Sequence, residues 1–190
     1  MLALGIEPYN IWINAAVLAF MKSIANPLLD RAMAALGQSY LLVLPLIAIY
    51  MFLRKDKNVY TFAVAVVLFY IVGDLIKVIV KEPRPCNTPG LSINSYACES
   101  NYSFPSNHAT VLTGLPAFLG RYKYLRPLYI AWLLLVLFGK MYIGAHYFTD
   151  ILAGALLSVA MAYILYRYKG RINGFINIIL KKSVSFLSIK

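Results

Sequence analysis

Long apolar segments alternate with short polar clusters along most of this chain. The clearest segment covers residues 59–80 and would cross a hydrocarbon core of about 30 Å, because an α-helix rises about 1.5 Å per residue. Four other stretches have a similar character, at residues 28–53, 106–120, 125–142 and 147–168. The pattern predicts an all-α, polytopic transmembrane helical bundle of about five spans.

The two flanks are more polar and do not fit a simple span. Residues 8–35 mix apolar stretches with asparagines and charges, and Pro27 interrupts any helix that begins near Ile11. We expect an interfacial N-terminal helix followed by a turn, and a sixth span in this segment stays open. The tail, residues 171–190, interleaves apolar with basic residues, as an amphipathic helix on an anionic leaflet would. With no internal repeat and no long linker, residues 1–190 are expected to form a single domain.

The composition is that of a membrane protein, and this affects how the positive net charge is interpreted. Hydrophobic residues make up 61% of the 190 residues, and the mean hydropathy of +0.71 is too high for an ordinary soluble domain. A net charge of +11 would suggest a nucleic-acid partner in a soluble protein, but here it fits positive cytoplasmic loops. We therefore expect no nucleic-acid partner. The first basic residue is Lys22, so we expect no cleavable signal peptide.

Basic residues predict the orientation of the bundle. Most of the 18 fall on one side of the predicted spans, and the positive-inside rule makes that side cytoplasmic. These residues are Arg54, Lys55, Lys57, Arg121, Lys123, Arg126, Arg167, Lys169, Arg171, Lys181, Lys182 and Lys190. The C-terminus is therefore expected in the cytoplasm, and the large polar segment at residues 81–105 on the outer face of a cell membrane.

Three polar residues interrupt the last apolar stretches. Lys140, His146 and Asp150 are the only Lys, Arg, Asp, Glu or His residues between Pro127 and Tyr166. A charged side chain at the bilayer centre costs about 2.5–3.5 kcal/mol on insertion scales, so such residues mostly line polar sites within the protein. At helical spacing Asp150 can hold one ring nitrogen of His146 and leave the other as a lone pair. The alternative is a capping aspartate beside an interfacial histidine.

Two more polar clusters lie on the same outer side, at residues 77–85 and 105–108. Together with residues 140–150 they supply cations, two imidazoles, and hydroxyl and backbone donors at a predicted helix start. Helix N-termini and basic side chains bind anionic oxygens, and positive charge stabilises phosphoryl transfer. The three clusters predict a site for a phosphoryl group that faces away from the cytoplasm.

The same clusters resemble the three motifs of the type 2 phosphatidic acid phosphatase superfamily. The matching positions, in chain order, are Lys77 with Arg84-Pro85 (K-x6-R-P), Pro105-Ser106-Asn107-His108 (P-S-x-H), and Lys140, His146 and Asp150 (R-x5-H-x3-D). Gly139-Lys140 replaces the usual Ser-Arg, so a point charge on a flexible stem replaces a bidentate fork. Asn107 fills a position often held by Gly or Asp.

The resemblance implies a role for each matching residue. His146 would attack phosphorus and form a phosphohistidine, while Asp150 orients its ring and stabilises its positive charge. His108 would protonate the leaving oxygen and later deprotonate the hydrolytic water. The phosphoryl oxygens would be held by Lys77, Arg84, Ser106, the backbone N–H of Asn107 and Lys140.

The resemblance also implies that no metal or other cofactor takes part. The outer side offers mainly cations, whereas an oxygen-ligated metal needs several convergent carboxylates. We expect a membrane lipid that enters from the outer leaflet, and favour hydrolysis of a polyprenyl diphosphate to the monophosphate and inorganic phosphate, by analogy with small carrier-lipid recycling members. A phosphatidate or phosphatidylglycerophosphate phosphatase is the alternative enzyme. A non-catalytic relative that binds or transports phospholipids is the alternative from another class.

Cys86 and Cys98 are the only cysteines of the chain. Both fall in the polar segment on the outer side, where disulfides persist. We expect them to form a disulfide that orders the segment leading into Ser106. Two unpaired thiols in a loop are the alternative.

Overall fold

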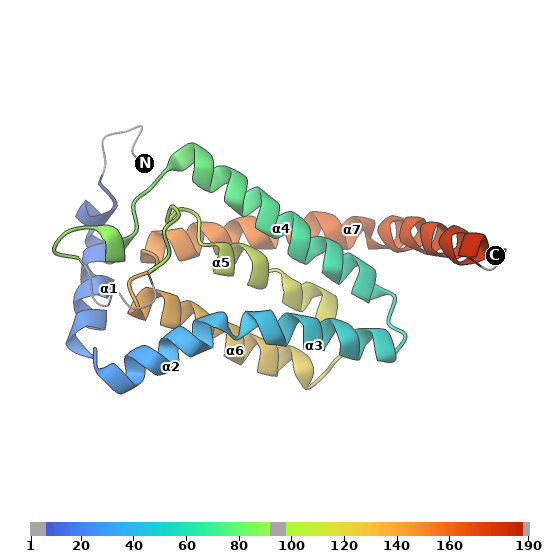
Figure 1. Ribbon diagram of the computed structural model, residues 1–190, viewed down its shortest axis with the longest axis horizontal. Helices are drawn as coiled ribbons and strands as arrows, with labels where there is room; N and C mark the ends of the chain where they lie inside the picture. Colours follow the sequence, from blue (N-terminus) through green and yellow to red (C-terminus); the bar gives the residue numbers. More distant parts are fainter. Residues whose placement is uncertain (1–6, 92–97, 188–190) are drawn as a thin grey trace.

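A computed structural model describes residues 7–91 and 98–187 of the chain. All regular structure in these residues is helical (Figure 1). The elements are η2 (Pro8–Asn10), α1 (Trp12–Ser23), α2 (Pro27–Gln38), α3 (Tyr40–Leu53), α4 (Asn58–Val80), η3 (Pro85–Asn87), α5 (Asn107–Leu112), η4 (Leu115–Leu119), α6 (Leu125–Tyr142) and α7 (Phe148–Leu187).

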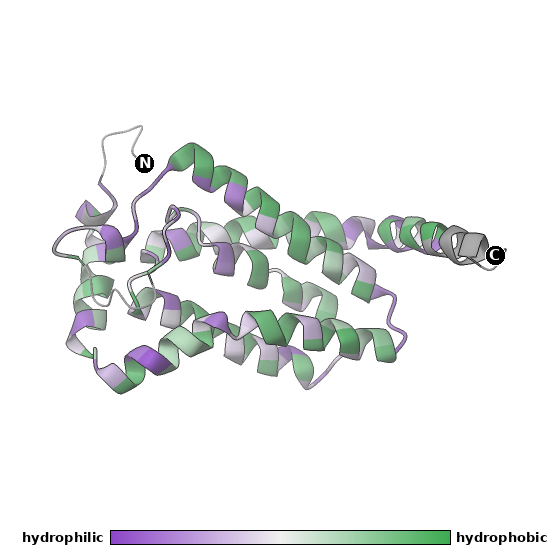
Figure 2. Ribbon diagram, viewed as in Figure 1, coloured by the Kyte–Doolittle hydropathy of each residue, from purple (hydrophilic) through white to green (hydrophobic). Residues whose placement is uncertain are grey.

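Four helical segments among the described residues are long and apolar enough to cross a membrane. They are Pro27–Leu53, Asn58–Asn87, Leu125–Tyr142 and Phe148–Ile179. In Figure 2 hydrophobic residues cover these helices, and hydrophilic ones gather at the end of the bundle next to α1 and in the α3–α4 turn. The prediction of a polytopic helical bundle is confirmed, and the chain is an integral membrane protein.

The expected span at residues 106–120 is not one continuous helix. It forms the short helix α5 and the 3-10 helix η4, separated by a turn at Gly114. The backbone N–H of Gly114 donates to Ser158 Oγ at 2.8 Å, and Pro116 has no N–H to continue an α-helix. Irregular backbone at this depth is tolerated because α4 and α7 enclose the segment.

Small residues allow these central segments to approach closely. A Cβ at Gly154 of α7 would lie 2.8 Å from the carbonyl oxygen of Ser106, and one at Gly73 of α4 would lie 2.5 Å from Asn107 Oδ1. Lipid is as apolar as the helix surfaces, so membrane helices associate through close packing of this kind. The two contacts hold the start of α5 between α4 and α7.

The N-terminal flank forms the short helix that was expected, whereas the C-terminal flank does not form a helix of its own. α1 lies across one end of the bundle (Figure 1), and at 12 residues it is too short to be a sixth span. Pro27 opens α2 after the turn, with the Asn26 side chain accepting from the N–H of Leu29. The tail, in contrast, continues α7 to Leu187 and does not form a separate helix, because no proline interrupts it.

Four helix ends lie at the end of the bundle where α1 is found and bring the three sequence clusters together. α4 and α6 end there, and α5 and α7 begin there (Figure 1). Backbone hydrogen bonds join the connecting loops: the N–H of Ser106 donates to the carbonyl of Asp150 at 3.1 Å, and that of Cys86 to Gly144 at 2.9 Å. The bundle thus presents residues far apart in the chain to one enclosed space.

Candidate functional site

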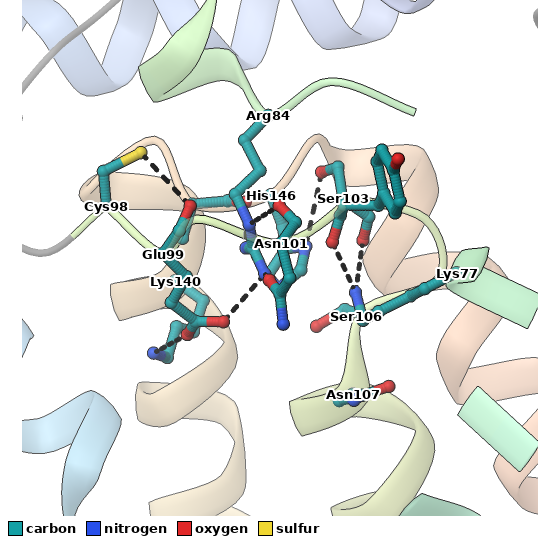
Figure 3. A network of polar contacts seen from close by, with 12 residues as sticks. Lys77, Arg84, Cys98, Glu99, Asn101, Ser103, Ser106, Asn107, Lys140 and His146 are labelled. Atoms are coloured by element: carbon teal, nitrogen blue, oxygen red, sulfur yellow. Dashed lines mark hydrogen bonds and ion pairs between the residues drawn. The ribbon is translucent and has the colours of Figure 1, made fainter. Parts of the chain in front are cut away.

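Charged and polar side chains from the helices and their connecting loops are buried at this end of the bundle, and Figure 3 shows how most of them lie. Each is at most 2% exposed, although several carry formal charges. They are Lys77, Arg84, Ser106, Lys140, His146 and Asp150. Buried charges persist only where partners satisfy them, so the contacts of these residues define the site.

His146 lies between a cation and a carboxylate. Its Nε2 is 3.2 Å from Arg84 Nη1, and its Nδ1 is 3.5 Å from Asp150 Oδ2. A guanidinium can only donate, so Nε2 must be the ring nitrogen that accepts, and the proton of a neutral ring sits on Nδ1, facing Asp150. The lone pair of Nε2 therefore points toward the cations.

The charge state of His146 follows from its surroundings. Burial lowers its pKa well below the usual value, and the positive charges of Arg84 and Lys77 lower it further. The imidazole is consequently neutral at pH 7. A neutral ring keeps the lone pair that a nucleophile requires.

Two donors besides His146 hold the carboxylate of Asp150. Its Oδ2 accepts from the backbone N–H of Tyr147 at 2.8 Å and from the hydroxyl of Ser103. The same hydroxyl lies 3.4 Å from Nδ1 of His146. These contacts orient the carboxylate toward the ring. Ser103 is therefore a residue of the site that the three sequence motifs do not contain.

All three guanidinium nitrogens of Arg84 donate hydrogen bonds within the site. Nε donates to the carbonyl of Asn101 at 3.0 Å and Nη1 to the carbonyl of Ala145 at 2.7 Å. Nη2 donates to Glu99 Oε2 at 2.7 Å and also to the side chain of Asn101. The fork is thus fixed in one orientation with its Nη2 edge toward Glu99.

Lys77 holds the backbone of the loop that precedes α5. Its ammonium donates to the carbonyls of Tyr102 and Ser103 at 2.8 and 3.0 Å. An ammonium has three donors, so one remains beyond these two. Lys77 therefore positions Ser103 as well as adding positive charge near His146.

The start of α5 contributes His108, opposite His146. The ring centroids of the two histidines are 6.5 Å apart. The ring of Tyr40 packs edge-on against His108, with centroids 4.9 Å apart. Ser106 caps the helix by accepting from the N–H of Ala109, at 3.4 Å. The two imidazoles can therefore face opposite sides of one small group.

The predicted ligand at position 107 has its side chain turned away from this space. Nδ2 of Asn107 lies 3.4 Å from Asp74 Oδ1 on α4, and the close approach of Gly73 keeps it there. This arrangement leaves only the backbone N–H of Asn107 as a candidate donor.

Lys140 is enclosed and does not reach out to the interface. It is 1% exposed, and a Cβ at Gly37 of α2 would lie 2.9 Å from its Cε. Its ammonium lies 3.3 Å from Oε1 of Glu99. The side chain therefore points into the same cluster as Arg84.

Glu99 and Glu82 are the acidic residues that the sequence analysis missed. Glu99 contacts both Arg84 and Lys140, and Glu82 is fully buried beside the loop, with its carbonyl accepting from the N–H of Ser103 at 2.8 Å. Glu99 lies outside the three motifs, and Glu82 fills an unspecified position of the K-x6-R-P motif. A glutamate in a polar loop is ordinarily solvated. Only the loop conformation brings them inward.

Cys86 and Cys98 are joined by a disulfide in the structure. The bond ties η3, which directly follows Arg84, to the residue before Glu99. Residues 92–97, between the two cysteines, lie outside the described part of the chain. The disulfide therefore joins the two segments that carry the partners of the Arg84–Glu99 ion pair, each just outside the closed loop.

Fold and site together define a polytopic helical membrane protein with an enclosed, cation-lined centre built around two histidines. The chain belongs to the PAP2 superfamily, which matches residues 58–173. The match includes all three motifs, and the family resemblance drawn from them is confirmed.

Individual relatives agree with this assignment. Sphingosine-1-phosphate phosphatase 1 of Rattus norvegicus is 31% identical over 120 residues, which cover 57% of this chain and 27% of that protein. The undecaprenyl-diphosphatase of Sulfolobus acidocaldarius is 24% identical over 131 residues, 67% of this chain and 63% of that protein. The chain therefore spans about a quarter of the length of the first relative and somewhat under two thirds of the second.

Solved structures share the fold. The transmembrane PAP2 type phosphatidylglycerolphosphate phosphatase of Bacillus subtilis superposes with a TM-score of 0.66 at 22% identity, over 84% of this chain and 85% of that one. LpxE of Aquifex aeolicus gives a TM-score of 0.62 at 22% identity, over 81% and 94%. The helical arrangement is thus that of known membrane PAP2 proteins.

Proposed function

We propose that this protein is a membrane lipid phosphatase that works through a phosphohistidine on His146. The observation that carries the proposal is the position of Nε2, an accepting nitrogen beside Arg84 with Asp150 behind the opposite nitrogen. A ligand-binding or transport protein needs the cations but has no use for an oriented lone pair. Family membership and the phosphatase names of the relatives support the same reaction class.

In the first step the Nε2 lone pair of His146 forms a bond to phosphorus while the bond from phosphorus to the leaving oxygen breaks. Arg84, Lys140 and Lys77 stabilise the charge that builds on the non-bridging oxygens. Asp150 stabilises the positive charge that develops on the ring through Nδ1–H.

His108 supplies the proton that the leaving oxygen takes. The anionic substrate favours protonation of the ring as it arrives between the two histidines. In the second step a water attacks phosphorus, gives its proton to His108 and breaks the N–P bond. Inorganic phosphate leaves, and both histidines return to their starting states.

The lipid would reach the site from the bilayer. An apolar pocket between α3, α4 and α5 has His108 on its wall, together with Tyr40, Leu44, Val66, Tyr70 and Val111. A second apolar groove continues it along α3 and α4 and shares Tyr40, Leu44 and Val66. A hydrocarbon chain could lie in this path with its phosphate between the histidines.

We propose a polyprenyl diphosphate as the preferred substrate, converted to the monophosphate and inorganic phosphate. The lining next to His108 is almost wholly apolar, and a polyprenyl diphosphate has no polar group between its phosphates and its hydrocarbon chain. A glycerol or amino-alcohol headgroup would need hydrogen-bonding partners there. Similarity to an undecaprenyl-diphosphatase supports this choice. We place the site on the extracytoplasmic side of the cell membrane.

Phosphate release from a panel of lipids tests the proposal. The purified chain in detergent is given undecaprenyl diphosphate, phosphatidate, phosphatidylglycerophosphate and sphingosine 1-phosphate, each with a chelator. We expect the highest kcat/KM with undecaprenyl diphosphate and no loss with the chelator. A preference for a glycerophospholipid would contradict the proposed substrate. Loss of activity with the chelator would contradict the proposal that the reaction needs no metal.

A labelled-phosphate quench tests the mechanism. Acid-quenched wild-type protein should carry label, and His146→Ala should carry none and turn nothing over. His108→Ala should slow both formation and breakdown of the labelled protein, because the proton is no longer supplied or retrieved. Label retained by His146→Ala would assign the nucleophile to another residue.

A further inference from the structure

A carboxylate already occupies the cationic centre that a phosphoryl group would need. Glu99 Oε2 is 2.7 Å from Nη2 of Arg84, and Oε1 is 3.3 Å from the ammonium of Lys140 (Figure 3). The side chain of Glu99 is 33% exposed, whereas those of its two partners are buried. The anion therefore sits at the open side of the centre, in contact with both cations.

A phosphoryl group and this carboxylate would need the same donors. Three of the five N–H donors of Arg84 are taken by the backbone and side chain of Asn101 and by the carbonyl of Ala145. A ligand could share the two that remain, the Nη1–H that faces His146 and the Nη2–H that faces Glu99. Glu99 holds the second of these. A phosphate that enters must displace Glu99 or share its donors at closer range.

The segment that carries Arg84 also anchors Glu99. Cys98, the preceding residue, is bonded to Cys86, and the side-chain amide of Asn87 donates to the carbonyl of Glu99 at 3.2 Å. A tethered group competes at a high effective concentration. Burial raises the pKa of Glu99, but the charges of Arg84 and Lys140 outweigh this effect and hold the pKa below its usual value. The competitor is therefore ionised at neutral pH.

We propose that Glu99 is a built-in competitor at the phosphoryl site, which lowers the affinity for every anion so that only a highly charged phosphate still displaces it from Arg84 and Lys140. A phosphomonoester carries about −1.5 to −2 charges at pH 7. The phosphodiester headgroup of bulk phospholipid carries only one negative charge, no more than the carboxylate that it would have to replace. Glu99 thereby keeps a site that opens toward the bilayer from filling with the phosphodiesters of the surrounding lipid. This inference rests on the proposed phosphatase function.

The first test measures how a phosphodiester lipid competes with the diphosphate substrate. Full-length wild type, Glu99→Gln and Glu99→Asp are purified in detergent, and phosphatidylglycerol in mixed micelles is titrated against turnover of undecaprenyl diphosphate. We expect Glu99→Gln to tighten inhibition by phosphatidylglycerol about tenfold, as loss of a charge-assisted competitor would. Glu99→Asp keeps the charge and should keep most of the competition. Glu7→Gln removes an exposed carboxylate elsewhere and serves as the control for net charge.

The results distinguish two roles for Glu99: competition with the ligand, and positioning of Arg84 and Lys140. If Glu99 only positions Arg84 and Lys140, then Glu99→Gln should raise KM and weaken phosphatidylglycerol inhibition, which would overturn the inference. Unchanged inhibition in Glu99→Gln would overturn it as well. A lower KM with stronger inhibition supports it.

A binding measurement keeps the inference independent of turnover. Inorganic phosphate is titrated into the same proteins by calorimetry, and we expect Glu99→Gln to bind it about tenfold more tightly than wild type. Tighter binding without hydrolysis of any lipid would reject the proposed function and leave the role of Glu99 intact. Hydrolysis with equal phosphate affinity in the two proteins would reject the role of Glu99 alone.

Discussion

At the scale of single residues, the protonation of His146 is the most specific consequence of the site. The contact between Nε2 and Arg84 requires a ring protonated at Nδ1. Its lowered pKa means that the neutral form should persist below pH 6.5, about the usual pKa of histidine. Nitrogen NMR on ¹⁵N-histidine-labelled protein would report tautomer and charge, and His108→Ala leaves a single histidine for assignment. An imidazolium at pH 7, or an Nε2–H tautomer, would contradict the geometry.

Lys140 gives a second residue-scale prediction. A charge-assisted hydrogen bond to a phosphoryl oxygen contributes about 1.5–3 kcal/mol, so Lys140→Ala should lower kcat/KM about 10- to 150-fold. Lys140→Arg should keep much of the activity if the planar fork fits beside Gly37. Lys81→Gln is the matched control, because Lys81 is exposed on the same side of the bundle. Wild-type efficiency in folded Lys140→Ala would show that this lysine is not a ligand.

At the scale of elements, the packing of α5 against α7 determines whether the two histidines face each other. Gly154 lies one turn after Asp150 and touches Ser106, Ala109 and Thr110, at 2.8–3.0 Å from an added Cβ. Gly154→Ala should therefore displace α5 and destabilise the fold by about 1–3 kcal/mol, the usual effect of overpacking. Thermal unfolding and kcat/KM should fall together.

Gly170→Ala is the control for that substitution. Gly170 lies on the same helix with nothing within 4 Å of an added Cβ. Alanine is favoured over glycine within helices by about 0.5–1 kcal/mol, so the change should leave stability unchanged or raise it slightly. Equal losses in both variants would mean that helix propensity, and not the contact with α5, explains the result.

Element boundaries show where sequence reasoning was sufficient and where it failed. The apolar runs at 59–80 and 125–142 predicted α4 and α6 closely, because lipid-facing helices need an uninterrupted apolar surface. The run at 106–120 looked equally apolar, yet protein surrounds it and Gly114 turns it toward Ser158. Apolarity alone does not distinguish a segment buried in protein from one buried in lipid.

At the scale of the whole molecule, the site and the basic turns lie at opposite ends of the bundle. The site is beside α1, whereas residues 54–57 and 121–124 connect helices at the other end, toward which α7 extends (Figure 1). The positive-inside rule therefore predicts an extracytoplasmic site. A cysteine at exposed Ser23 should react with an impermeant maleimide in intact cells, and one at exposed Lys123 only after permeabilisation. The reverse pattern would place the site in the cytoplasm.

The sequence by itself determined the class of protein and nominated the residues of its candidate site. Long apolar runs require helices in lipid, and isolated Lys, His and Asp residues within them require a shared polar site. Resemblance to the family motifs then predicted His108, His146, Asp150 and the cations as site residues.

Tertiary structure decided which groups surround those residues and what each can do. The accepting nitrogen of His146, the enclosed position of Lys140 and the carboxylate of Glu99 all depend on loop conformation and helix contacts between distant segments. Glu99 shows the reason most clearly. Its sequence neighbours suggest a solvated loop, but the disulfide and the close approach of α6 turn it onto two buried cations. Local sequence specifies a residue's chemistry, and its partners are specified only when the chain folds.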